Sequence, residues 1–332
     1  MVILKLNIYQ KKMIGDLMNS IRNTNKFVLF IFILQFIMAF FWANIMEFFK
    51  VPIQFNLILL QITVFGIPIL IYLLKTKQNF KETLSIRKLK LLNIILIILI
   101  SIFIQPVMSL IAAISNLFFP NTVSELFIET IYNNVPIWQL LISIALTPAI
   151  FEEFMFRGII FQGYKTTSIF KACLISGFIF GMAHMDLQQS IYASIMGMFF
   201  CFMLYKTKSI FAPMLSHFVI NGTQVLLSYV ELKNMENLDI INSLLTPSLS
   251  DKFFSIFIIS IIVLFTLPIL ILLILAFLKT NKNIKTEEIY YNLPKYRQEK
   301  IFDKPIISVI SIFCLQAIIL QILPKIIKFL SF

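Results

Sequence analysis

Long apolar runs recur along the whole chain of 332 residues. An α-helix rises 1.5 Å per residue, so it needs roughly 20 apolar residues to cross about 30 Å of hydrocarbon. Such runs predict membrane-spanning helices near residues 27–46, 57–74, 91–118, 137–161, 168–185, 190–205, 210–229, 253–278 and 305–323. We therefore expect an all-α fold, a polytopic transmembrane helical bundle of about 8–9 spans.

The composition points to the same class of protein. The chain is 59% hydrophobic and 13% charged, which leaves too little polar surface to cover a water-soluble globule of this length. A net charge of +12 would also suit a nucleic-acid-binding protein, but the basic residues lie in short loops between apolar runs and form no single stripe. We expect membrane lipid around the protein and no nucleic acid partner. The three cysteines have no paired spacing and predict neither a disulfide framework nor a zinc knuckle.

The distribution of lysine and arginine predicts the topology. The loop 75–90 carries six basic residues against one glutamate, whereas the loop 119–136 carries two glutamates and no basic residue. Positive loops stay on the cytoplasmic side, so the first loop and the amino terminus are expected to be cytoplasmic, and the basic leader is expected to be retained with the first span as an anchor. Trp42 and Trp138 are interpreted as interfacial anchors, and Asp186 as the outer boundary of its span.

Ionisable residues inside the apolar runs mark the candidate site. Both histidines of the chain, His184 and His217, lie in such runs, and so do Glu152, Glu153 and Arg157. Charged and polar groups are costly in hydrocarbon and usually face a polar cavity or a partner. Counting 1.5 Å per residue from the lysines that end each run places Glu152, His184 and His217 near one depth. The plainer interpretation is a static ion pair and two satisfied core histidines.

Helical spacing separates the two glutamates. Glu153 and Arg157 are four residues apart, so they share a helix face and are expected to form an ion pair that offsets part of their burial cost. Glu152 lies about 100° round the helix and is left to point elsewhere. Pro148 removes a backbone donor and frees the carbonyl of Ile144, which should loosen this helix and admit water.

The two histidine segments show the same one-turn spacing. His217 and Asn221 share a helix face, and Phe180 lies one turn before His184, where its ring can hold the imidazole. Asn221 could merely bond a neighbouring helix, or its amide could take part in chemistry.

These groups allow two kinds of site. A carboxylate and an imidazole can jointly take a proton from water, while a second imidazole and an amide donate to an oxyanion, which suffices for peptide hydrolysis without a covalent intermediate. Alternatively, Glu152, His184 and His217 could hold zinc. We favour a site without cofactor, because the H-E-x-x-H arrangement is absent and Asn221 is a poor zinc ligand.

Three motifs in order resemble a known family. The chain contains E-E-x-x-x-R, then an aromatic residue four before a histidine, then a histidine four before an asparagine. This series resembles the CAAX prenyl endopeptidase and bacteriocin-processing intramembrane proteases, also called the ABI or CPBP family. The matching residues are Glu152, Glu153 and Arg157, then Phe180 and His184, then His217 and Asn221.

The resemblance implies a role for each of these positions. Glu152 and His184 would activate the attacking water. His217 and Asn221 would form the oxyanion hole. Structural or substrate-orienting roles would fall to Glu153, Arg157 and Phe180.

The resemblance also organises the chain. The catalytic core is expected at residues 137–230, preceded by a basic leader with the first three spans at 1–136 and followed by a transmembrane extension with a basic cytoplasmic loop at 231–332. The implied protein is a multi-pass intramembrane endopeptidase of a bacterial cell membrane. Its substrate would be a peptide or the carboxy terminus of a protein, with or without a lipid, which includes bacteriocin leaders.

Two other classes of function fit the same residues less well. A noncatalytic scaffold or regulator of a sensor kinase or of a peptide-processing partner could use the same fold, but degenerate motif residues would be expected there, and none of the motif positions is degenerate. A proton-coupled transporter could use Glu152 and the histidines as a relay, yet no inverted repeat is evident in the sequence.

Overall fold

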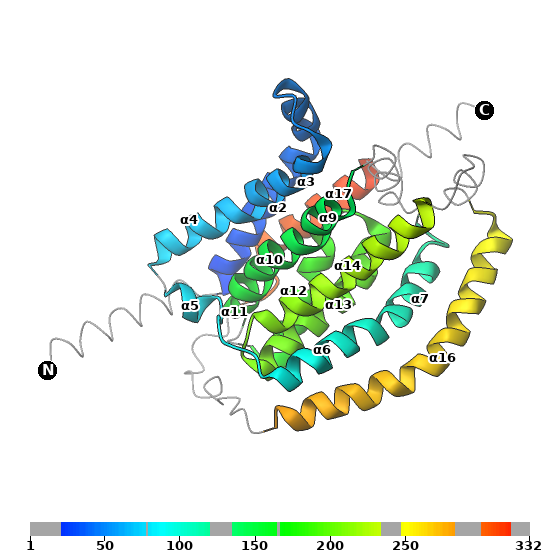
Figure 1. The fold of residues 1–332 in the computed structure, drawn as a ribbon. Helices are drawn as coiled ribbons and strands as arrows, with labels where there is room; N and C mark the ends of the chain where they lie inside the picture. Colours follow the sequence, from blue (N-terminus) through cyan, green and yellow to red (C-terminus); the bar gives the residue numbers. More distant parts are fainter. Residues whose placement is uncertain are drawn as a thin grey trace, which may run out of the picture.

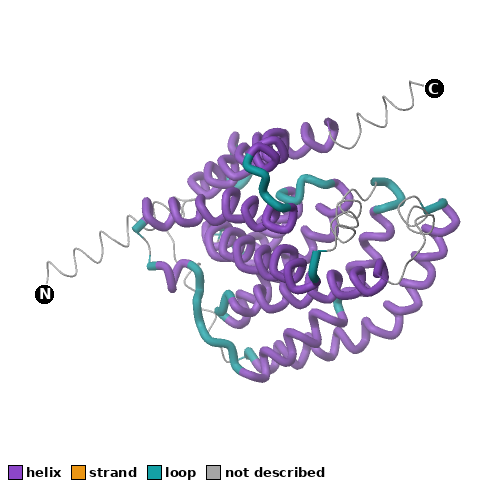
Figure 2. Tube along the Cα trace, turned by 45° about the horizontal axis from the view of Figure 1, so that its top comes forward, coloured by secondary structure: helices purple, strands orange, loops and turns teal. Residues whose placement is uncertain are grey.

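The computed structural model describes residues 21–77, 79–119, 135–164, 167–233, 247–282 and 300–319, and within these ranges every regular element is helical (Figure 1, Figure 2). This confirms the predicted all-α class. The elements, with η for π-helical stretches, are α2 (Ile21–Phe48), α3 (Ile53–Gln61), η1 (Ile62–Gly66), α4 (Ile67–Thr76), α5 (Phe80–Thr83), α6 (Leu91–Phe103), α7 (Gln105–Ser115), α9 (Ile137–Leu140), η2 (Leu141–Leu146), α10 (Thr147–Glu153), η3 (Phe154–Ile160), α11 (Phe161–Gly163), α12 (Ile169–Met182), α13 (Leu187–Thr207), α14 (Phe211–Lys233), α16 (Leu249–Thr280) and α17 (Lys304–Ala317).

Within the part of the chain that the structure describes, six helical stretches are long and apolar enough to cross a membrane, which makes the chain a multi-pass integral membrane protein. They are Ile21–Phe48, Phe55–Thr76, Leu91–Ser115, Ile137–Gly163, Leu187–Thr207 and Leu249–Thr280. The helices α12 and α17 are apolar but shorter. The predicted span at 210–229 forms α14, whose 23 residues would suffice by length. It is not among the six, because the polar residues of the candidate site lower its hydropathy.

The helices α12 and α13 form a hairpin at the centre of the bundle (Figure 1). A Cβ placed on Gly197 would lie 2.8 Å from the Cα of Gly177, so only glycines permit the two helices to cross this closely. The helix α14 packs against α6, α10 and η2, and α16 lies outside α6 and α7 with most of its apolar side chains exposed. The result is a central hairpin, buried on one side, with apolar helices packed against it.

The first and last helices that the structure describes, α2 and α17, meet at one polar cluster. Asn25 of α2 is fully buried, and its Nδ2 donates to the Ile301 carbonyl at 2.9 Å and to Asp303 Oδ1 at 2.8 Å. The hydroxyl of Tyr164, just after α11, donates to the amide oxygen of Asn25. Asp303 also caps α17 by accepting from the Ile306 amide. The cluster joins α2, α11 and α17 at one end of the bundle.

The predicted span at 168–185 is longer than the helix found there. The helix α12 ends at Met182, and Met185 has a left-handed backbone with φ of 56°. The next helix, α13, is capped by Asp186, which accepts a 2.7 Å hydrogen bond from the Gln189 amide. The structure therefore corrects the position of His184, which lies in the turn between two helices and not inside a span. Asp186 does mark a helix boundary, as expected. Much of the loops used to predict orientation, residues 120–134 and 283–299, lies outside the described residues.

Candidate active site

The helix that carries the two glutamates is loosened on both sides of them. Residues Leu141–Leu146 and Phe154–Ile160 adopt π-helical geometry around α10, and Pro148 supplies no backbone donor. The carbonyl of Ile144, which an α-helical donor at position 148 would satisfy, accepts from Asn221 Nδ2 at 3.1 Å. The sequence thus predicted the loosened helix correctly, and the freed carbonyl accepts from an amide of α14.

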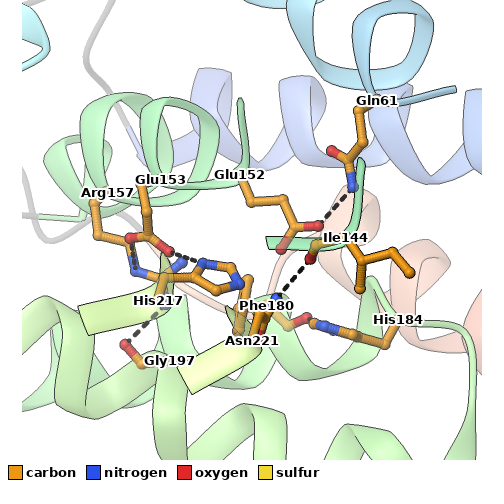
Figure 3. A network of polar contacts seen from close by, with 10 residues as sticks. All are labelled: Gln61, Ile144, Glu152, Glu153, Arg157, Phe180, His184, Gly197, His217 and Asn221. Atoms are coloured by element: carbon orange, nitrogen blue, oxygen red, sulfur yellow. Dashed lines mark hydrogen bonds and ion pairs between the residues drawn. The ribbon is translucent and has the colours of Figure 1, made fainter. Parts of the chain in front are cut away.

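Glu153 is sealed inside the protein. Its Oε2 lies 3.1 Å from Arg157 Nε, with both side chains fully buried, so the expected ion pair is present. Its Oε1 lies 2.9 Å from Nδ1 of His217, a contact between distant segments that the spacing of residues did not predict (Figure 3). Arg157 also donates from Nη2 to the carbonyl of Gly197 at 3.3 Å. Glu153 therefore joins a guanidinium and an imidazole from two helices.

Aromatic rings enclose this charged cluster. The guanidinium carbon of Arg157 lies 4.2 Å from the ring centroid of Phe180 and 5.0 Å from that of Phe200. The imidazole of His217 stacks on Phe200 with centroids 5.2 Å apart and an interplanar angle of 22°. The rings exclude solvent, so the charges of Glu153 and Arg157 depend on each other for compensation.

Glu152 has different surroundings. Its Oε1 accepts from Nε2 of Gln61 at 2.8 Å (Figure 3). The carboxylate also borders a cavity. Gln61 comes from α3, which lies far from Glu152 in the sequence and was not expected to contribute to the site. The available signal was an amide in the middle of an apolar run, because polar residues in membrane helices usually bond across a helix interface.

His184 is held in one orientation by Phe180. The imidazole Nδ1 lies 2.9 Å from the Phe180 carbonyl, which can only accept, so Nδ1 carries the proton. The ring of Phe180 also stands edge-on to the imidazole, with centroids 4.8 Å apart. When His184 is neutral, its Nε2 therefore has a free lone pair. This atom is the acceptor that the residue can offer to a ligand.

A cavity of about 530 Å³ brings Glu152 and His184 together. Its walls come from α2, α3, η1, α13 and α17 as well as from the turn that holds His184. Trp42, interpreted from the sequence as an interfacial anchor, is one of the lining residues. His217 and Asn221 lie behind this surface and do not line the cavity. The structure thus gathers the predicted residues in one region but divides them into two halves. The open half, which lines the cavity, consists of Glu152 and His184. The sealed half, which does not, consists of Glu153, Arg157, His217 and Asn221.

The zinc alternative requires Glu152, His184 and His217 to converge. Among the residues that the structure describes, no group of three or more His, Cys, Asp or Glu side chains is arranged to hold a metal ion. The ring of Phe180 contacts both imidazoles edge-on, and Nδ1 of His217 faces Glu153 instead of Glu152. The metal-free site stays a prediction, which a metal analysis tests.

Comparison with known proteins identifies the central part of the chain. Residues 133–223 match the model of the family described as "Type II CAAX prenyl endopeptidase Rce1-like". This segment is therefore similar to the CAAX prenyl endopeptidase family. Over 86 residues the chain is also 38% identical to the "Putative membrane peptidase YdiL" of Bacillus subtilis (strain 168), covering 26% of this chain and 35% of that protein. No solved structure matches the chain significantly.

The family match and the cavity cover different parts of the molecule. All seven motif residues lie within 133–223, which supports a membrane protease at the level of the family. In contrast, Gln61 and the cavity walls from α2, α3 and α17 lie outside the matched segment. The family match therefore covers the motif residues but not the whole lining of the cavity.

Proposed function

We propose that the protein is an intramembrane endopeptidase that hydrolyses a peptide bond with a water activated between Glu152 and His184. One observation carries this proposal: of the residues that line the cavity, these two alone are titratable. The family of the central segment and the name of the bacterial relative support the same class of reaction.

The two side chains suit complementary roles toward a water molecule. One carboxylate oxygen of Glu152 is bound by Gln61, which leaves the other to accept a proton from water. His184 offers Nε2, because its Nδ1 is bound to the Phe180 carbonyl. A water between the two acceptors is oriented by one and deprotonated by the other, and the acquired proton later passes to the leaving amine.

We assign the oxyanion donors to the sealed half of the site, so the scissile carbonyl must reach past the cavity wall to His217 and Asn221. The amide of Asn221 donates one of its two hydrogens to the Ile144 carbonyl, and the second hydrogen is available to another acceptor. His217 directs Nδ1 at Glu153, so its Nε2 donates only when the ring is an imidazolium. A cationic donor beside an amide donor would stabilise the negative charge that develops on the scissile carbonyl oxygen.

The same proposal includes the setting of the reaction. The substrate is a peptide segment, internal or carboxy-terminal, that enters from surrounding membrane lipid. The lysine-rich loops favour a cytoplasmic amino terminus.

The test compares the peptides released in membranes that contain the wild-type protein or Glu152→Ala. Mass spectrometry should find fragments that depend on wild-type protein and that disappear in the variant although it accumulates normally. Glu231→Ala, at an exposed position of α14, is the matched carboxylate control and should preserve the fragments. Equal fragments from the wild-type protein and Glu152→Ala would contradict the proposal and leave a noncatalytic scaffold.

A metal analysis of active, purified protein tests the mechanism separately. We expect no stoichiometric zinc and no loss of cleavage on treatment with a chelator. Zinc at one equivalent, with cleavage lost to the chelator and restored by the metal, would replace the proposed mechanism by metal-assisted hydrolysis.

A further inference from the structure

Several buried polar atoms of the cavity wall have no hydrogen-bond partner among the described residues. The buried oxygens Oε1 of Gln35, Gln61 and Gln316 and the buried Nε1 of Trp42 have no hydrogen-bond partner among the described residues. All four side chains line the cavity that holds Glu152 and His184. Buried donors and acceptors are rarely left unsatisfied, so this grouping in one wall calls for a ligand.

The orientation of two of these amides follows from their partners. Nε2 of Gln61 donates to the Glu152 carboxylate, and Nε2 of Gln35 donates to the Ala183 carbonyl at 2.9 Å. Carboxylate and carbonyl oxygens accept only, so each amide must keep its own oxygen for another donor. A glutamine side chain has several rotatable bonds, which allow this oxygen to turn into the cavity when a donor arrives.

We propose that this wall is a binding site for the backbone of an extended peptide, with the three glutamine oxygens accepting its N–H groups and Trp42 donating to one of its carbonyls. A peptide backbone offers both donors and acceptors, whereas a lipid tail offers neither. A transmembrane helix satisfies its own N–H groups internally. The occupant is therefore a locally unwound segment. This inference rests on the proposed endopeptidase and names its substrate class.

The origin of the wall supports a role in substrate choice. Gln35 and Trp42 belong to α2, Gln61 to α3 and Gln316 to α17, all outside the segment 133–223 that matches the family. The reacting groups thus come from the family segment, and the backbone acceptors come from helices before and after it. Contacts to backbone atoms also tolerate many side chains, so the site selects an unwound conformation more than a particular sequence.

Trp42 provides a direct measure of occupancy. The chain has two tryptophans, and Trp138 is 58% exposed, so Trp138→Phe leaves Trp42 as the single reporter in the cavity wall. The probes are two leucine-rich transmembrane peptides with a dansyl acceptor, one with a central Gly-Pro-Gly break and one with leucines there. Binding is measured by energy transfer in lipid nanodiscs, in the inactive Glu152→Ala background. The broken peptide should bind saturably and at least about tenfold more tightly than the helical one.

Variants of the wall identify the atoms responsible. Gln35→Met and Gln316→Met keep the length of the side chain and remove the acceptor, and each should weaken binding of the broken peptide about tenfold. Gln224→Met, at an exposed position of α14, is the matched control and should bind like the parent. In the catalytically intact protein, Gln316→Met should raise KM for the broken peptide and leave kcat nearly unchanged, as loss of uniform binding does.

The outcomes separate this inference from the proposed function. Equal affinity for both peptides, or unchanged affinity in both cavity variants, would overturn the backbone-binding wall. Displacement of the broken peptide by farnesol at stoichiometric amounts would also overturn it, because the cavity would then be an isoprenoid site. Glutamine-dependent binding without any cleavage by the intact protein would support the wall and count against the endopeptidase.

Discussion

Glu152 and Glu153 are adjacent in the sequence and differ in almost every other respect. Glu153 is fully buried, and both of its oxygens face a cationic or imidazole partner. Glu152 retains 9% exposure, accepts one amide hydrogen bond and borders the cavity. A rotation of about 100° along one helix produces this difference. The comparison teaches that residue type does not decide the role of a buried carboxylate, since its partners do.

The largest expected contrast is between removal of each charge. Glu152→Gln should lower the cleavage rate by roughly 10²–10⁴, because the base is lost, and leave thermal unfolding close to that of the wild type. Glu153→Gln should instead lower the unfolding temperature, since Arg157 keeps an uncompensated buried charge. Purified variants would be compared in cleavage and thermal unfolding assays. Equal loss of stability in both would abolish the distinction between open and sealed halves.

Replacement of Arg157 tests the sealed half of the site separately from the open half. Arg157→Ala leaves Glu153 buried without its ion-pair partner and should cost about 3–5 kcal/mol of stability, with cleavage falling too. The double variant Arg157→Met with Glu153→Gln removes both charges and should recover most of the stability but not the activity, because His217 loses its carboxylate. Reversible unfolding in mixed micelles measures both. Normal stability of Arg157→Ala with cleavage lost would place Arg157 in the chemistry instead.

Asn221 tests whether the sealed half contributes donors to the reaction. Asn221→Ala removes the proposed oxyanion donor and should reduce kcat by about 10²–10³ with KM little changed. Steady-state kinetics on one cleaved peptide provides the measurement. An increase confined to KM would show that the amide binds substrate or only supports the Ile144 carbonyl.

The smallest effect is expected far from both glutamates. Tyr164→Phe removes the hydroxyl that donates to Asn25 at the cluster of α2, α11 and α17, which should cost about 0.5–1.5 kcal/mol. Cleavage should stay near the wild-type rate, because the cluster does not line the cavity. Unfolding and cleavage assays on the same preparation check this. A large loss of activity would mean that the terminal helices control the open half.

Local spacing in the sequence was sufficient to predict some of these features. The Glu153 and Arg157 pair, the helix loosened near Pro148 and the turn-apart placement of Phe180 and His184 all depend on residues within one helical turn. The recognition of the family is confirmed by the match of residues 133–223.

Other features depend on how distant helices pack, and the sequence could not supply them. The bond between Gln61 and Glu152 joins residues 91 positions apart, and the bond between His217 and Glu153 joins residues 64 apart. Hydropathy also placed His184 inside a span, because an apolar turn between two helices has the same composition as the helices. Helix periodicity carries no information on any of these contacts.

Phe180 has a consequence for any attempt to move or redesign this site. Its ring lies against the Arg157 guanidinium, and its carbonyl fixes the proton of His184, so one residue mechanically couples the sealed half to the open half. A displacement of the charged cluster is therefore transmitted to the imidazole that faces the cavity. If Glu152 and His184 were copied into another helical bundle without Phe180, both side chains would be present, but the contacts that orient the imidazole would be lost.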